Sequence, residues 1–170
     1  GENRLEGVLC EMYPTAEITN TTSQRASCDF RLAREGHYPI LIETKNYDRN
    51  VNPEEVKKFL RDIDEQGMSG IFLSQSSGIT SRQNFHIEMR GTSVLIYLHH
   101  VHYEPYRIQM AVDAIDMITA RMSEISGEAK CEFSISRETL EEVGREYKSC
   151  LRRRDEHLIL LRDYHKRAID

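Results

Sequence analysis

The amino-acid sequence predicts an α/β fold in which a mixed β-sheet is flanked by helices. Segments with strand-like composition alternate along the chain with segments whose apolar residues recur at helical spacing. A strand over 39–46, a helix over 53–66 and a strand over 69–75 form one βαβ unit, which predicts a parallel pair with a right-handed crossover. A hairpin turn with Gly36 and Pro39 precedes this unit, so the sheet should contain antiparallel strands as well.

The segment before the βαβ unit is expected to form one helix and two strands. Residues 2–12 carry apolar side chains at helical spacing, and Pro14 ends the pattern. Strands are predicted over 16–22, which is rich in Thr and Ile, and over 26–33, where apolar and polar residues alternate. For the helix over 53–66, Asn52 is a suitable N-cap, and a proline occupies the first helical position.

The C-terminal half is expected to contain a hairpin and two helices. Strands over 84–90 and 93–101 flank an Arg-Gly-Thr turn, and a long helix follows over 105–125. We expect a short strand over 130–135 and a final helix over 136–168, with its first serine as the N-cap. We divide the chain into a domain over 1–128 and an extension over 129–170.

Composition restricts the function classes. The 170 residues are 39% hydrophobic and 30% charged, which suits one domain with an appendage and excludes a disordered tail. The formal net charge of -5 argues against a protein that coats nucleic acid without selectivity. No apolar run approaches the roughly 20 residues of a membrane helix, and no signal-peptide pattern is present. We therefore expect an intracellular protein, in the cytoplasm or nucleus, with no membrane partner.

Cysteines and histidines show no familiar metal-ligand spacing. We expect the four cysteines to be reduced packing residues, since no two are spaced as CxxC: Cys10, Cys28, Cys131 and Cys150. Three histidines cluster at a strand end without an HExxH context, which favours a solvated strand end over a zinc site: His99, His100 and His102.

The informative pattern is Asp29 followed, fourteen residues later, by Glu43-Thr44-Lys45. Glu43 and Lys45 share one face of a strand, and Asp29 lies on the neighbouring hairpin strand. Two carboxylates and the backbone carbonyl of Thr44 are ligands that suit Mg²⁺ or Mn²⁺. Lys45 could orient or deprotonate an attacking water, or stabilise transition-state charge, as in hydrolysis of phosphodiesters. The alternative is a solvated hairpin whose charged side chains form surface ion pairs.

The order of these residues and elements resembles the PD-(D/E)xK nuclease superfamily, which includes restriction endonucleases and Holliday-junction resolvases. The resemblance is carried by Glu6, by the segment 27–30 and by the segment 41–45. It implies a restriction-endonuclease-like αβββαβ core over about residues 1–125. It also implies a DNA endonuclease or resolvase-like enzyme in which Asp29 and Glu43 bind Mg²⁺ and Lys45 is catalytic. Cys28 stands where the family often has proline.

The first helix should supply a further acid. Many family members carry a glutamate there that reaches the metal through water, and Glu2 and Glu6 both lie on a suitable face. We favour Glu6 because its Leu-Glu-x-Val-Leu context is closer to the family helix. The stretch 67–125 also resembles nuclease-like domains of large DNA viruses.

Several residues near this pattern are candidates for binding DNA, each with a plain alternative. Arg25 and Ser27 could contact phosphate or belong to an ordinary loop. Tyr47 and Arg49 could stack on or pair with DNA, although turn chemistry also explains their segment. Gln75 follows a buried strand, at the kind of strand end that borders ligand sites in α/β sheets.

The C-terminal helix carries a pattern close to a heptad, interrupted around residues 152–154. A helix of this length cannot pack fully on so small a core. The pattern favours a homodimer, a partner helix or a link to a further domain over an arm that lies along DNA with its three arginines. The alternative function is an inactive nuclease-fold module of a larger protein, which binds or scaffolds, with this helix mediating oligomerisation.

Overall fold

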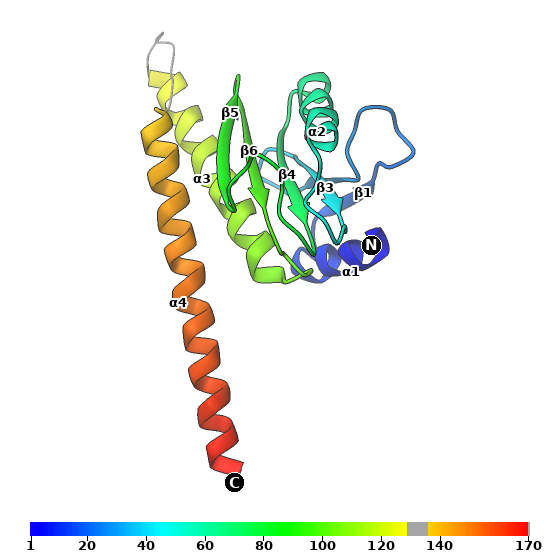
Figure 1. Cartoon of the computed structure of the whole chain (residues 1–170). Coiled ribbons are helices and arrows are strands. Elements are labelled where there is room, and N and C mark those ends of the chain that lie inside the picture. The colour runs from blue at the N-terminus through cyan, green and yellow to red at the C-terminus, as the bar shows by residue number, and fades with distance from the viewer. Residues whose placement is uncertain (129–135, 170) are drawn as a thin grey trace.

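The computed structural model describes residues 1–128 and 136–169, which form an α/β fold on one mixed sheet (Figure 1). In chain order the elements are α1 (Glu2–Met12), β1 (Glu17–Asn20), β2 (Phe30–Ala33), β3 (Ile40–Lys45), α2 (Pro53–Gln66), β4 (Ser69–Ser74), β5 (His86–Arg90), β6 (Ser93–Leu98), α3 (Pro105–Glu128) and α4 (Arg137–Ile169). The predicted order of helices and strands is confirmed. The predicted strand over 130–135 lies outside the described residues.

The six strands of the described residues are ordered β1-β2-β3-β4-β6-β5. The predicted parallel pair is confirmed as β3–β4, and the predicted C-terminal hairpin as β5–β6. β1, β2 and β3 pair antiparallel, whereas β6 joins β4 in parallel and leaves β5 at the edge. The mixed sheet of the prediction is therefore correct, and β3 and β4 occupy its centre.

Helices cover both faces of the sheet (Figure 1). One core cluster combines inward residues of α1, α3 and α4 with alternate residues of the strands, such as Ile42 and Ile71. On the other face, Phe59 of α2 packs edge-on against Phe72 and Tyr97, with ring centroids 5.3 and 5.9 Å apart. Because β3, β4 and β6 are buried on both faces, their sequences are nearly continuous apolar runs.

Helix α2 begins and ends as the sequence predicts. The side chain of Asn52 accepts a hydrogen bond from the Glu55 N–H at 3.1 Å, and Pro53 is the first helical residue. Gly67 follows with φ 63°, a left-handed conformation that suits glycine at a helix C-terminus. These two ends determine how α2 crosses from β3 to β4.

The strand expected over 26–33 begins only at Phe30, so Asp29 precedes β2 instead of lying within it. Ala26 and Cys28 have φ angles of 53° and 57°, which no strand residue adopts. The hydroxyl of Ser27 donates to the backbone carbonyls of Thr21 and Gln24, at 2.9 and 3.1 Å. A compact turn stabilised by these bonds replaces the strand that the alternating pattern predicted.

The expectation that the cysteines are packing residues is wrong for two of them. Cys10 and Cys150 are free and exposed, whereas Cys28 is free and buried. Cys10 follows the buried Leu9 on α1, and a one-residue step on a helix turns the side chain about 100° away from the core face. Cys131 lies outside the described residues.

Helix α4 packs along the sheet edge only in its N-terminal half. Leu140 and Leu151 join the core, and Tyr147 stacks on Phe85 with ring centroids 5.1 Å apart. The remainder extends beyond the body (Figure 1) and exposes apolar side chains, among them Leu161 at 64% and Tyr164 at 71%. The prediction that this helix is too long for the core is confirmed. No helix within the described ranges is long and apolar enough to cross a membrane.

The close contact between β4 and α2 predicts a sensitive position at Gly70. A Cβ added there would lie against Ile63 Cδ1 and 2.9 Å from Phe59 Cζ. We expect Gly70→Ala to lower the free energy of unfolding in chemical denaturation by about 1–3 kcal/mol, because the core must shift. The control is Gly7→Ala, where an added Cβ meets nothing within 4 Å. Equal stability of the two variants would contradict this packing.

The histidine cluster predicts a pH effect on stability. His99 is half-buried, and its Nε2 accepts a hydrogen bond from the Ile79 N–H at 3.2 Å. Burial, with the charges of His100 and Lys148, lowers the pKa of His99 from 6.5 to about 4. The unfolded chain therefore binds a proton that the folded chain does not, and stability falls as the pH drops from 6.5 toward 4.

We expect His99→Gln, which keeps a hydrogen-bond acceptor but does not titrate, to lose less unfolding free energy than the wild type over this pH range. Denaturant titrations of both proteins at several pH values measure the difference. Parallel pH profiles would exclude the role given to His99.

Candidate metal centre

Strand β3 presents Glu43 and Lys45 on the face that α2 covers. The two residues alternate with Thr44, so their side chains share one side of the sheet. Lys45 Nζ lies 2.8 Å from Glu43 Oε1. The Glu43 side chain is 0% exposed and that of Lys45 is 16% exposed, so the pair is not the solvated surface pair of the alternative reading.

Asp29 is held against the same strand by two hydrogen bonds. Its N–H donates to the carbonyl of Ile42 at 3.1 Å, and its Oδ2 accepts from the Thr44 N–H at 2.8 Å. The N–H and C=O of one strand residue point to the same edge, so the Thr44 carbonyl also points toward the Asp29 side of β3. Asp29, Glu43 and this carbonyl therefore gather at the end of the central strand.

Burial and mutual charge dominate the electrostatics of the pair. Burial raises the pKa of Glu43, and the neighbouring Asp29 carboxylate raises it further, while Lys45 and Lys58 act in the opposite direction. Burial also raises the pKa of Asp29, against the Thr44 hydrogen bond and the charge of Lys45. Both carboxyl groups are thus arranged so that an added cation would stabilise their charged forms.

Lys45 remains an ammonium group. Burial alone lowers the pKa of Lys45, but the hydrogen bond to Glu43 and the charges of Glu43, Glu55 and Asp29 outweigh this effect and raise the pKa above its ordinary value. Its Nζ lies 3.3 Å from Glu55 Oε2 in addition to its contact with Glu43. A lysine with this pKa donates hydrogen bonds and positive charge; it does not accept a proton near neutral pH.

Helix α2 covers the site and contributes charged side chains to it. Glu55, Lys58 and Asp62 follow one another at steps of three and four residues, so they lie on one helix face. Lys58 Nζ lies 3.6 Å from Glu43 Oε1. Asp62 Oδ2 accepts a hydrogen bond from the Cys28 N–H at 3.2 Å, which connects α2 to the turn before β2.

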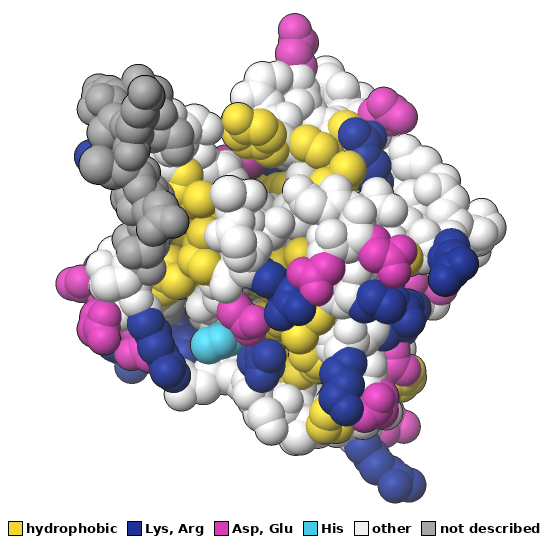
Figure 2. Space-filling model, turned by 90° about the horizontal axis from the view of Figure 1, so that it is seen from above, with side chains coloured by type: hydrophobic (Ala, Val, Ile, Leu, Met, Phe, Trp, Pro, Cys, Tyr) yellow, Lys and Arg dark blue, Asp and Glu magenta, His cyan; other side chains and the backbone are white. Residues whose placement is uncertain are grey.

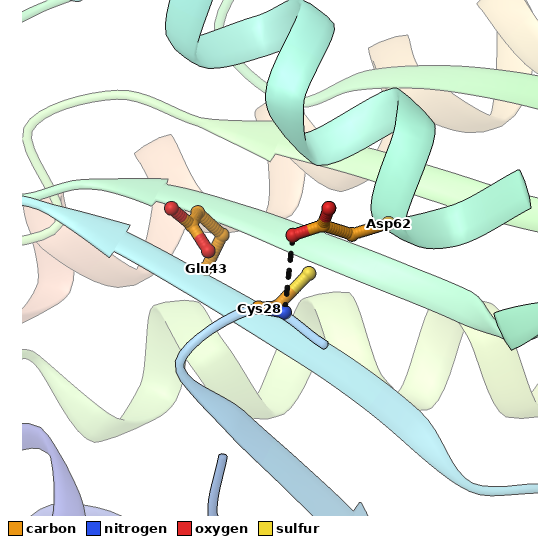
Figure 3. A group of neighbouring side chains, drawn as sticks. All are labelled: Cys28, Glu43 and Asp62. Atoms are coloured by element: carbon orange, nitrogen blue, oxygen red, sulfur yellow. Dashed lines mark hydrogen bonds between the residues drawn. The ribbon is translucent and has the colours of Figure 1, made fainter. Parts of the chain in front are cut away.

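Three buried side chains converge between this turn, β3 and α2. Figure 3 shows Cys28, Glu43 and Asp62 directed toward one another from these three elements. One ligand atom from each lies within 4.8 Å of the other two, so the group could hold a metal ion. Burial raises the pKa of the Cys28 thiol, and the charges of Glu43, Asp62 and Asp29 raise it further.

The hydrogen bonding of Glu43 fits a cation site. Among the described residues, none donates a hydrogen bond of regular geometry to either of its carboxylate oxygens, although both are buried. Buried carboxylates in folded proteins are nearly always hydrogen-bonded. A divalent cation would supply the missing interaction, and the oxygen donors Asp29 and Glu43 match the preference of Mg²⁺.

The other predicted site residues divide by burial. Gln75 is fully buried, and its amide bridges the Thr44 hydroxyl and the Tyr103 N–H, so it holds the end of β3. Ser27 is likewise buried and bonded within its own turn. Tyr47 is 40% exposed, and its hydroxyl donates to Glu55 at 3.0 Å. Arg25 and Arg49 are exposed.

The first-helix acids differ in their relation to Asp29. The charge of Glu2 raises the pKa of Asp29. Glu6 is half-buried and makes no hydrogen bond or ion pair with the residues that the structure describes. The choice of Glu6 over Glu2, which depends on the more family-like local sequence of Glu6, stays a prediction.

Three residues of the centre did not emerge from the sequence pattern: Glu55, Asp62 and Cys28 as a ligand. A signal was present for Asp62, because it lies beside Ile63 and three residues after Phe59, on the apolar side of α2. A charged residue in such a stripe is buried and therefore needs a partner. The adjacent Arg61 contacts Asp62 Oδ1 at 3.1 Å. The second partner, the N–H of Cys28, is 34 residues away and was not evident from spacing.

Comparisons of the chain with protein-family models, with curated proteins and with solved structures gave no match.

The buried carboxylate of Glu43 predicts that metal binding and stability of the metal-free protein change in opposite directions. In a metal-free buffer near neutral pH, we expect Glu43→Gln to unfold at a higher temperature than the wild type, since it removes a buried charge. Mn²⁺ should raise the unfolding temperature of the wild type and leave that of the variant unchanged. Glu54→Gln, which changes a glutamate that is 77% exposed on α2, is the matched control and should respond like the wild type. A Mn²⁺ response that survives in Glu43→Gln would exclude this carboxylate as a ligand.

Proposed function

We propose that the protein is a metal-dependent DNA endonuclease or resolvase-like nuclease of the PD-(D/E)xK type. The observation that carries the proposal is the fully buried Glu43 carboxylate beside Asp29 at the end of the central strand. Lys45 contacts its Oε1 at 2.8 Å, and its Oε2 has no partner among the described residues. Such a group is unfavourable for folding alone, and buried acids of this kind concentrate at functional sites.

The arrangement of elements supports the same proposal. A helix, a three-stranded antiparallel meander, a crossover helix and a parallel strand follow in the order of a restriction-endonuclease-like αβββαβ core. Asp29 directly precedes β2, and Glu43 and Lys45 lie at the end of β3, so the three residues are close enough to support the proposal. Fold likeness alone does not establish an activity, so the argument depends on the site.

The residues divide the work of phosphodiester hydrolysis. Asp29, Glu43 and the Thr44 carbonyl would hold Mg²⁺ or Mn²⁺, which activates water and neutralises phosphate charge when bound. Lys45, kept protonated by its acidic neighbours, would orient the attacking water and stabilise the negative charge that develops on phosphate. The side-chain amide of Gln75 donates a hydrogen bond to the Thr44 hydroxyl and so holds Thr44 in place.

DNA would approach a surface of mixed charge. In Figure 2, Lys and Arg side chains are interspersed with Asp and Glu over the face shown. The exposed Arg25 and Arg49 flank the centre in sequence, and Tyr47 is available for stacking. With a net charge of -5, we infer weak and salt-sensitive binding of DNA that depends on the metal.

A second candidate function is an inactive nuclease-fold module that scaffolds a larger assembly. It is favoured by the exposed apolar side chains on the C-terminal half of α4: Ile159, Leu160, Leu161, Tyr164 and Ile169. This surface fits either a homodimer or a partner helix. The candidate shares the metal centre but lacks turnover, so an activity assay separates the two.

The test is cleavage of supercoiled plasmid and of a four-way DNA junction by the purified chain with Mg²⁺ or Mn²⁺. We expect Asp29→Asn, Glu43→Gln and Lys45→Met each to lower the rate by about 100-fold or more, because each removes a group that acts on the reacting phosphate. Lys57→Ala, 70% exposed on α2, is the matched control and should cleave at the wild-type rate. Cleavage at the wild-type rate in all three variants would contradict the nuclease proposal. Mn²⁺ binding by the wild type without any cleavage would favour the scaffold.

A further inference from the structure

The buried centre contains two sets of donor atoms that share Glu43. Asp29 and the Thr44 carbonyl offer oxygen from the β2 edge of β3, and Glu43 offers its carboxylate oxygens from the face that α2 covers. Cys28 and Asp62 lie on the α2 side and add sulfur to the group. Hard cations such as Mg²⁺ select oxygen donors, whereas Zn²⁺ and Cd²⁺ bind well to thiolate sulfur.

We propose that Cys28, Asp62 and Glu43 form a second cation position, selective for thiophilic divalent metals such as Zn²⁺ and Cd²⁺, that competes with the Mg²⁺ position for Glu43. The donor set is the mixed sulfur and carboxylate set that zinc accepts. Binding breaks the Sγ–H bond of Cys28, forms a metal–sulfur bond and releases the proton to solvent.

The geometry requires little movement. The three donor atoms lie within 4.8 Å of one another, and atoms bound to one tetrahedral zinc are about 3.5 Å apart by ordinary bond lengths. Closing the difference takes a displacement of about 1 Å, which side-chain rotation of Glu43 and Asp62 supplies. The turn that carries Cys28 is already held by the Asp62 hydrogen bond to the Cys28 N–H, so ligand and turn are positioned together.

Two features indicate a ligand in addition to the proximity. Glu43 is 0% exposed, and although Lys45 and Lys58 contact its Oε1, its Oε2 has no partner among the described residues, so this buried oxygen is available to a cation. Lys58 provides the access route: its Nζ contacts Glu43 at 3.6 Å while 46% of its side chain is exposed, so rotation of this side chain uncovers Glu43.

Competition between the two positions follows from the shared carboxylate. Glu43 cannot bind both cations fully, so a thiophilic metal on Cys28 should displace Mn²⁺ from Asp29 and Glu43. Inhibition of cleavage by Zn²⁺ rests on the proposed nuclease function; binding at Cys28 does not. A thiophilic metal bound at the Cys28 position would thus control whether Mn²⁺ or Mg²⁺ binds to Asp29 and Glu43.

The probe is Cd²⁺ alone, followed through the ultraviolet charge-transfer absorption of its bond to thiolate. The protein is the full chain carrying Cys10→Ser, Cys131→Ser and Cys150→Ser, which leaves Cys28 as its single thiol. We expect one equivalent of Cd²⁺ to produce the band and to raise the unfolding temperature. Adding Cys28→Ser should abolish the band, and Asp62→Asn should weaken Cd²⁺ binding by about tenfold or more.

Two controls keep the outcome interpretable. Mn²⁺ should still raise the unfolding temperature of the Cys28→Ser chain, which shows that this chain is folded and keeps its oxygen site. Excess Mn²⁺ should weaken Cd²⁺ binding to the chain that retains Cys28. No band from Cys28, or Cd²⁺ affinity unaffected by Asp62→Asn, would overturn the second position while leaving the nuclease proposal standing. Binding at Cys28 in a chain that cleaves no DNA would remove only the nuclease proposal.

Discussion

The structure depends on the burial of a carboxylate in the middle of its sheet. Glu43 lies on β3, which pairs with neighbours on both sides and is covered on both faces, so no water reaches its side chain. Burial of a charged carboxylate is strongly unfavourable unless cations and hydrogen bonds surround it. Lys45 and Lys58 supply the cations at Oε1, whereas Oε2 has no partner among the described residues and is the oxygen that a metal would bind.

Helix α2 makes this burial tolerable and at the same time organises the site. Its apolar side, with Phe59, packs on the sheet, while Lys58 and Asp62 reach the buried polar atoms from above. The caps at Asn52 and Gly67 place the helix so that these two requirements are met together. Packing of the core and positioning of the chemistry therefore depend on the same fourteen residues.

The turn before β2 is the other support of the centre. Ala26 and Cys28 adopt left-handed backbone conformations that are unfavourable for non-glycine residues. Hydrogen bonds from Ser27 and to Asp62 compensate for this strain, and the result places Asp29 against Thr44 and the Cys28 sulfur under α2. Local strain that persists in this way is typical of functional sites.

The sequence by itself determined the order of the elements, the ends of α2 and the strand face that Glu43 and Lys45 share. Each follows from local rules, namely periodicity, capping and the two-residue repeat of a strand. Only the tertiary structure decided that Asp29 precedes β2, that β6 lies between β4 and β5, and that Asp62 and Cys28 join Glu43. These depend on contacts between residues far apart in the chain, such as the bond from the Cys28 N–H to Asp62, whose energies outweigh local preference and leave no periodic trace in the sequence.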